Sequence, residues 1–212
     1  LWGQDEYKDY CKQHCIGLLR CKREKMCVHP KEIGNGINDC PVFRDDERVC
    51  GDFTCHEGCQ CNGMVQFCQG QQINEMTGFH TATTMLFLTG NKIRDVSLSN
   101  YRRLIVLDVS INKIVRLTAG HFCSNSPFLL WLFVSRNSID HIDPLTFHRC
   151  RYLTWLDLSS NSIAQLTDGS LSSLLNLQVL NMSHCKLAII HGNVFQSLSG
   201  IKFLFLKGNR LI

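Results

Sequence analysis

A pattern of the form L-x-L-x-x-N-x-I constrains the fold of this chain more than any other feature, and it recurs six times after residue 83. The first copy contains Leu86, Leu88, Asn91 and Ile93. The residues at the asparagine position of the six copies are Asn91, Asn112, Asn137, Asn161, Cys185 and Asn209. From one copy to the next, their numbers differ by 21, 25, 24, 24 and 24. A period of this length indicates a solenoid, in which each unit buries its apolar face only against its neighbours.

The period and the pattern are those of the leucine-rich repeat. A short strand points alternate residues inward, so the leucines of each copy enter the core. The asparagine amide satisfies backbone groups where the strand turns, and we expect Cys185 to be a small, buried substitute. Apolar residues fill the convex side, at Phe122, Phe147, Leu171 and Phe195. We predict an α/β fold for residues 73–212, a leucine-rich repeat solenoid with a parallel β-sheet horseshoe of about six repeats, and we expect further repeats beyond Ile212.

Most of the cysteines lie early in the chain, with ten of the thirteen between Cys11 and Cys68. This density is typical of disulfide-rich modules in an oxidising, extracellular compartment, and the spacing of a zinc finger is absent. The cysteines at 55, 59, 61 and 68 stand directly before the repeats, where a solenoid needs a cap over its apolar edge. They resemble the cysteine-rich N-terminal flank of extracellular leucine-rich repeat proteins, which we assign to residues 52–72. The resemblance implies disulfide bonds between Cys55 and Cys61 and between Cys59 and Cys68.

A second cysteine-rich signature, within residues 1–51, resembles an LDL receptor class A module. The residues that carry the resemblance are Cys15, Cys21, Cys27, Cys40 and Cys50, with Asp39, Asp46 and Glu47. The resemblance implies two family disulfide bonds, Cys15 to Cys27 and Cys21 to Cys40. One family cysteine is replaced by Gly34, which leaves Cys11 and Cys50 to pair in compensation.

The same resemblance implies a calcium site built from oxygen ligands, which calcium prefers. The side chains at the matching positions are Asn35, Asp39, Asp46 and Glu47. Because Asn35 replaces an acidic ligand, the site has one carboxylate fewer and a lower expected affinity. Two interpretations stay open: a weak Ca²⁺ site, or a small module held only by its disulfide bonds.

Strand residues that flank the inward leucines face the concave side of the solenoid. The residues that we predict to bind a ligand there are Met85, Phe87, Asp108, Trp131, Phe133, Trp155, Asp157, Phe203 and Phe205. Aromatic anchors beside charged groups are typical of binding hot spots. The alternative is that these aromatics are scattered or pack against other parts of the chain. Asn181, in the sequence Asn181-Met-Ser183, is a glycosylation acceptor on the same face, and whether it is used stays open.

The order of the parts, from the cysteine-rich module through the flank to the repeats, resembles the ectodomain of relaxin-type receptors over residues 11–212. Those receptors are G-protein-coupled. The resemblance implies a chain on the extracellular side of the plasma membrane that binds a peptide or protein hormone and signals to a G protein through a seven-helix domain. It also implies that Asp108, Asp157, Trp131 and Trp155 contact a basic hormone helix. The alternative is a Toll-like receptor or a secreted adhesion protein.

Several classes of function find no support in the sequence. The net charge is +4 without any block of like charges, which argues against a nucleic-acid partner. The longest apolar run, residues 127–134, is far shorter than the ~20 residues that cross a bilayer, so contact with a membrane would come from sequence outside this chain. No catalytic motif is present, and we expect no enzyme. A bond between Cys123 and Cys150 is one option for the later cysteines, and Cys185 is expected to be a buried thiol.

Overall fold

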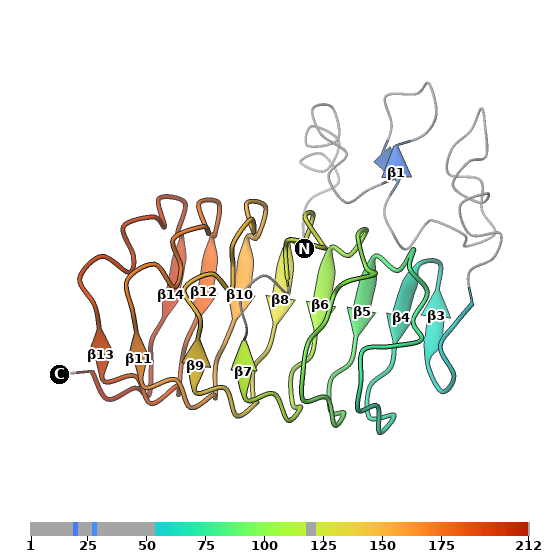
Figure 1. Ribbon diagram of the computed structural model, residues 1–212, viewed down its shortest axis with the longest axis horizontal. Coiled ribbons are helices and arrows are strands. Elements are labelled where there is room, and N and C mark those ends of the chain that lie inside the picture. The colour runs from blue at the N-terminus through green and yellow to red at the C-terminus, as the bar shows by residue number, and fades with distance from the viewer. Residues whose placement is uncertain (1–18, 21–26, 29–53, 118–121, 212) are drawn as a thin grey trace.

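The computed structural model describes residues 19–20, 27–28, 54–117 and 122–211, and residues 54–117 and 122–211 form a solenoid of stacked coils (Figure 1). One sheet runs along it in the order β14-β12-β10-β8-β6-β5-β4-β3. Its strands are β3 (Gln60–Asn62), β4 (Val65–Phe67), β5 (Met85–Phe87), β6 (Val106–Asp108), β8 (Trp131–Phe133), β10 (Trp155–Asp157), β12 (Val179–Asn181) and β14 (Phe203–Phe205). The hairpin β3–β4 is antiparallel, and every later pair in this sheet is parallel. The predicted parallel-sheet solenoid is therefore confirmed.

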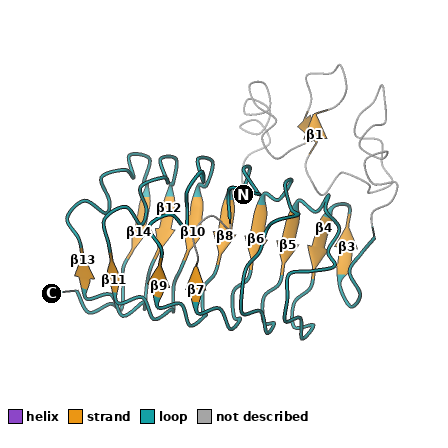
Figure 2. Cartoon of the chain, in the orientation of Figure 1, coloured by secondary structure: helices purple, strands orange, loops and turns teal. Residues whose placement is uncertain are grey.

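The convex side consists of turns and short strands (Figure 2). There β7 (Arg116–Leu117) pairs with β9 (His141–Ile142), and β11 (Gln165–Leu166) pairs with β13 (Ile189–Ile190), both in parallel. Over the ranges that the structure describes there is no helix, and hence none that could cross a membrane. Because each repeat is short, few residues remain for its convex segment, and these residues form turns and two-residue strands.

A column of leucines forms the core, because the central residue of each of five neighbouring strands points away from the concave face. These residues are fully buried: Leu86, Leu107, Leu132, Leu156 and Leu180. Burying a leucine stabilises the fold by roughly 1.5 to 3 kcal/mol. On the convex side Phe122, Phe147 and Leu171 are also buried, and Phe195 packs partly buried against the same core.

The cap ends this column with a polar residue instead of another leucine. Gln66 of β4 lies opposite Leu86 in the register and is completely buried. Its Nε2 donates to Oγ1 of Thr83 at 2.7 Å, and its Oε1 accepts from the N–H of His56 at 3.1 Å. The buried amide is thus hydrogen-bonded on both sides, as burial of a polar group requires.

Three disulfide bonds join described residues: Cys55–Cys61, Cys59–Cys68 and Cys123–Cys150. The first two tie the cap and are the pairs that the flank resemblance implies, while the third connects the convex segments of adjacent repeats. In the region assigned to the N-terminal module, β1 (Leu19–Arg20) pairs antiparallel with β2 (Cys27–Val28). The calcium ligands lie outside the described residues, and the structure describes no side chain of the remaining predicted disulfide pairs.

The asparagines form a ladder that closes each turn, as expected. Asn137 shows the pattern: its Nδ2 donates to the carbonyls of Val109 and Val134 at 3.0 Å, and its Oδ1 accepts from the N–H of Ile114 at 3.0 Å. Nδ2 also donates to the carbonyl of Ser135 at 3.2 Å, so two contacts are within its own repeat and two are to the preceding one. The ladder therefore locks neighbouring repeats together through the backbone.

Cys185 takes the place of an asparagine in the fifth repeat. It is a free, fully buried thiol, and its Sγ donates to the carbonyl of Leu158 at 3.1 Å. Burial raises the pKa of this thiol to about 11. A thiol replaces only the donor half of the amide, so no described side-chain oxygen accepts from the N–H of Ile163, the equivalent of Ile114.

The residue directly before each ladder position has a left-handed backbone. These six residues are Gly90, Ile111, Arg136, Ser160, His184 and Gly208, with φ between 51° and 73°. Left-handed φ is uncommon outside glycine and strained for a β-branched side chain. The stacked turns impose this conformation even on Ile111, where φ is 55°.

Candidate ligand-binding surface

The concave face consists of two rows of side chains that the parallel register aligns across the strands. The first row is Val65, Met85, Val106, Trp131, Trp155, Val179 and Phe203. The second row is Phe67, Phe87, Asp108, Phe133, Asp157, Asn181 and Phe205. All nine residues predicted to bind a ligand lie in these rows. The seven apolar members divide by their exposure into three groups, and the two aspartates lie beside the second group.

The first group lies next to the cap and is largely packed. Met85 is only 8% exposed, because it belongs to an apolar cluster with Val65, Ile105 and Val106. The ring of Phe87 stacks on that of Phe67 at 5.2 Å between centroids. Met85 thus offers little surface to a ligand. Sequence reasoning missed Phe67, although the alternation Val-Gln-Phe in residues 65–67 repeats the apolar outward positions of the next strand.

The second group is the aromatic cluster, defined here as Trp131, Phe133 and Trp155. The Trp131 and Trp155 rings meet edge to face with centroids 6.5 Å apart, and the Phe133 ring lies 6.0 Å from Trp155. Trp155 is 40% exposed, whereas Trp131 and Phe133 are half-buried. Ring pairs of this kind stabilise by about 0.5 to 1.5 kcal/mol each beyond area burial. The neighbouring rings therefore hold Trp155 in place while leaving much of it open to solvent.

Two aspartates lie beside the aromatic cluster and differ in how their oxygens are used. Asp108 accepts from the N–H of Ser110 at 2.9 Å through Oδ1 and from Oγ1 of Thr89 at 2.8 Å through Oδ2. Asp157 accepts from the N–H of Ser159 at 2.9 Å through Oδ1, and no described residue donates to its Oδ2. Asp157 is thus the better placed of the two to accept a hydrogen bond from a ligand.

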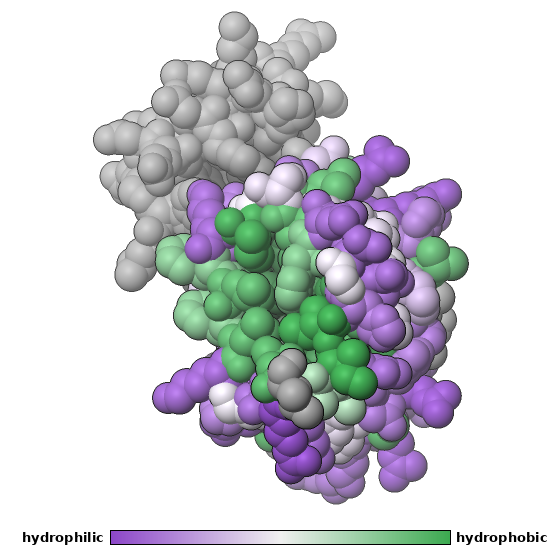
Figure 3. All heavy atoms as spheres, turned by 90° about the vertical axis from the view of Figure 1, so that its left-hand side faces the viewer, coloured by the Kyte–Doolittle hydropathy of each residue, from purple (hydrophilic) through white to green (hydrophobic). Residues whose placement is uncertain are grey.

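The third group is at the C-terminal edge, where Phe203 and Phe205 are 57% and 48% exposed. Their rings stack at 6.4 Å between centroids. Leu204 and Leu211 are also exposed near this edge, and the view from this end of the molecule shows an apolar surface (Figure 3). Strand β12, whose outward residues are half-buried, separates this group from the aromatic cluster.

Asn181 lies between Asp157 and Phe205 in the second row. It is half-buried, and its Oδ1 accepts from the N–H of Ser183 at 3.1 Å, the same local contact that Asp157 makes. Its use as a glycosylation acceptor stays a prediction. A glycan at this position would divide the concave face between β10 and β14.

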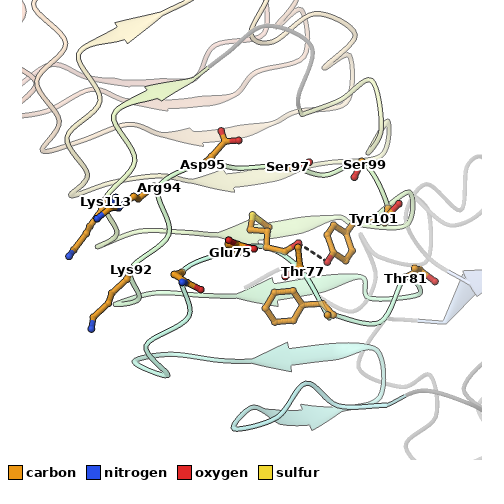
Figure 4. Close-up of a pocket in the computed structure, with 15 residues that line it drawn as sticks. Glu75, Thr77, Thr81, Lys92, Arg94, Asp95, Ser97, Ser99, Tyr101 and Lys113 are labelled. Atoms are coloured by element: carbon orange, nitrogen blue, oxygen red, sulfur yellow. Dashed lines mark hydrogen bonds between the residues drawn. The ribbon is translucent and has the colours of Figure 1, made fainter.

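A groove of about 810 Å³ opens away from the concave face, between residues 74–81 and the first repeats (Figure 4). Its lining mixes charges, with Glu75 and Asp95 near Lys92, Arg94 and Lys113. The buried Tyr101 hydroxyl donates to the carbonyl of Met76 at 3.0 Å. Within the described ranges no three histidine, cysteine or acidic side chains come together as a metal site.

Comparison with known proteins agrees with this architecture. The leucine rich repeat family matches residues 102–163 and 151–211, more than half of the chain, so the chain belongs to this family. A leucine-rich repeat protein of Leptospira interrogans has the same fold, with a TM-score of 0.52 and 23% identity over 62% of this chain and 33% of that one.

Three curated relatives illustrate the range of similar proteins. Leucine-rich repeat-containing G-protein coupled receptor 5 of Rattus norvegicus is 35% identical over 42% of this chain and 10% of its own length. Keratocan of Mus musculus is 28% identical over 76% of this chain and 46% of its own length. Toll-like receptor 7 of Mus musculus is 35% identical over 37% of this chain and 8% of its own length. The chain spans less than half of each relative.

Proposed function

We propose that this chain is the extracellular ligand-recognition region of a G-protein-coupled receptor and binds a peptide or protein hormone on its concave face. The observation that carries the proposal is the aromatic cluster beside Asp157, where a partly exposed indole adjoins a carboxylate oxygen without a described donor. An aromatic face and a carboxylate together suit a cationic side chain. The ligand surface therefore fits a basic peptide, with the chain on the outer side of the plasma membrane.

The similarity to the rat G-protein coupled receptor supports the receptor part of this proposal, over 42% of the chain. The disulfide bonds support an oxidising, extracellular compartment. Signalling to a G protein would pass through a membrane domain outside residues 1–212.

Replacing both aspartates by asparagine tests the hormone surface. Asn181 already occupies the equivalent strand position and accepts the same backbone hydrogen bond, so Asp108→Asn with Asp157→Asn should keep the fold. We expect this double variant to lose at least tenfold in affinity for a peptide selected from a panel of basic peptide hormones, measured by surface plasmon resonance on the full chain.

The matched control is Asp95→Asn with Asp140→Asn, which removes the same charge from exposed positions outside the concave face. This control should keep its affinity. Unchanged binding by the concave variant, or an equal loss in both variants, would refute the concave site.

Sequencing the transcript beyond the codon of Ile212 tests the receptor class. The proposal requires seven apolar spans downstream. A single span or a stop codon would contradict it and favour a Toll-like receptor or a secreted adhesion protein. The similarity to mouse Toll-like receptor 7 and the longer match to mouse keratocan support this second candidate.

A further inference from the structure

The edge of the solenoid where the chain enters each sheet strand is built from the same turn five times. In each turn the N–H of the fourth residue donates to the carbonyl of the first, as from Leu104 to Tyr101 at 3.1 Å and from Leu153 to Cys150 at 3.3 Å. The other three turns are 126–129, 174–177 and 198–201. The two central residues of each turn therefore occupy equivalent places and stack along one line, here named the strand-entry edge.

In the first three turns, five of the six central residues are basic or aromatic, and the exception is Pro127. The six residues are Arg102 and Arg103 before β6, Pro127 and Phe128 before β8, and Arg151 and Tyr152 before β10. Neighbouring strands are about 4.8 Å apart, so the two arginine-bearing turns lie roughly 10 Å apart with Phe128 between them. Arg149 is a further basic residue of this edge. It lies directly before Cys150, is exposed, and has a left-handed φ of 67°.

Charge is segregated on this edge. Residues 97–105, 122–130, 146–154, 170–178 and 194–202 contain four arginines, one lysine and one histidine but neither aspartate nor glutamate. All four arginines are exposed, and none forms an ion pair with a described acidic residue. The acidic side chains of the repeats lie elsewhere, on the concave face or on the segments that follow the strands. The first three turns of the strand-entry edge therefore carry positive charge without an acidic neighbour, and this part of the edge is named the basic strip.

An aromatic pair lies within the basic strip. The rings of Phe128 and Tyr152 stack with centroids 6.2 Å apart, and they are 39% and 38% exposed. Exposed apolar rings between arginines give a flat surface on which another ring can lie. The strip thus combines the guanidinium groups of arginines with the exposed ring faces of Phe128 and Tyr152.

We propose that the strand-entry edge binds a linear sulfated polysaccharide. Arginine forms paired hydrogen bonds with tetrahedral oxyanions, and a row of arginines along the solenoid suits a polymer that carries such groups at intervals. The apolar faces of sugar rings suit Phe128 and Tyr152. Disulfide bonds are typical of an oxidising, extracellular compartment, where such polysaccharides occur. This partner is separate from the concave ligand and does not depend on it.

Heparin immobilised on a sensor surface is the probe, and the full chain is tested with all its disulfide bonds. The variant Arg102→Gln, Arg103→Gln, Arg149→Gln, Arg151→Gln should bind heparin at least tenfold more weakly at physiological salt. A matched control, Lys92→Gln, Arg94→Gln, Lys113→Gln, Arg116→Gln, removes the same charge from exposed side chains that follow β5 and β6. The control should stay within threefold of the unmodified chain. Thermal unfolding checks that both variants fold.

An equal loss in the two variants would overturn the proposal, because binding would then follow net charge alone. Retention of affinity by the strand-entry variant would overturn it as well.

Single-stranded DNA and phosphatidylserine vesicles serve as competing polyanions. Binding to either with the same dependence on the four arginines would exclude specificity for the sulfated polymer. The variant Phe128→Ser with Tyr152→Ser should lower heparin affinity about threefold without changing the salt dependence. The aromatic-cluster variant Trp155→Ala should leave heparin binding unchanged.

Discussion

The inward column and the concave face alternate residue by residue along the same short strands, yet they obey different constraints. In β10 the central Leu156 is fully buried, while Trp155 and Asp157 on either side face the concave surface. Inward positions are leucine in all six repeat strands, whereas outward positions vary between aliphatic, aromatic, acidic and amide side chains. Stacking requires the first set to repeat, and it leaves the second set free to differ. Recognition can therefore be encoded in the strands without loss of the core.

The largest expected effect separates the two sets at adjacent residues. Leu156→Ala should lower the free energy of unfolding by about 2 to 5 kcal/mol, because it removes contacts and leaves a cavity in the column. Trp155→Ala should lower it by about 1 kcal/mol, since only ring contacts on the surface are lost. Urea unfolding followed by circular dichroism measures both values. Equal losses would mean that the concave cluster belongs to the core.

A smaller effect is expected at the backbone ladder. Asn137→Ala removes the acceptor of the Ile114 N–H and the donor to three carbonyls, so we expect a loss of about 2 to 3 kcal/mol. Asp157→Asn, which keeps its backbone contact, should change stability by less than about 0.5 kcal/mol. The same unfolding assay compares them. A neutral Asn137→Ala variant would contradict the role given to the ladder.

The smallest effect depends on pH and tests the one ladder position without an amide. The folded pKa of Cys185 is about 11, above the ordinary thiol value of 9.0, because burial disfavours the thiolate. The neutral thiol therefore stabilises the fold fully below pH 9, and this contribution falls by about 1 to 2 kcal/mol as the pH rises from 9 through 11. Cys185→Ala should not show this part of the decline. Urea midpoints of both proteins at pH 8.5 and 10.5 provide the measurement, and parallel declines would contradict it.

Much of the fold was predictable because every repeat restates it. Six copies of one pattern identified the inward leucines, the asparagine ladder and the buried place of Cys185. The left-handed turn before each ladder residue was not predictable, since only Gly90 and Gly208 reveal it. The other four residues adopt it because the stacked turns allow no other path. The repeated pattern thus identified the inward and ladder positions, but not the left-handed backbone of the residue before each ladder position.

The candidate sites divide in the same way. The sequence by itself determined which residues occupy the concave face, because alternation along a strand fixes the side of each side chain. Only the tertiary structure decided that Met85 is buried while Trp155 is open, and that Asp108 has both oxygens hydrogen-bonded while Asp157 keeps one without a described donor. It also aligned four arginines along one edge. The exposure and the alignment of these side chains depend on contacts between residues one repeat period apart. Only the hydrogen-bonded register of the stacked coils determines which of those residues meet.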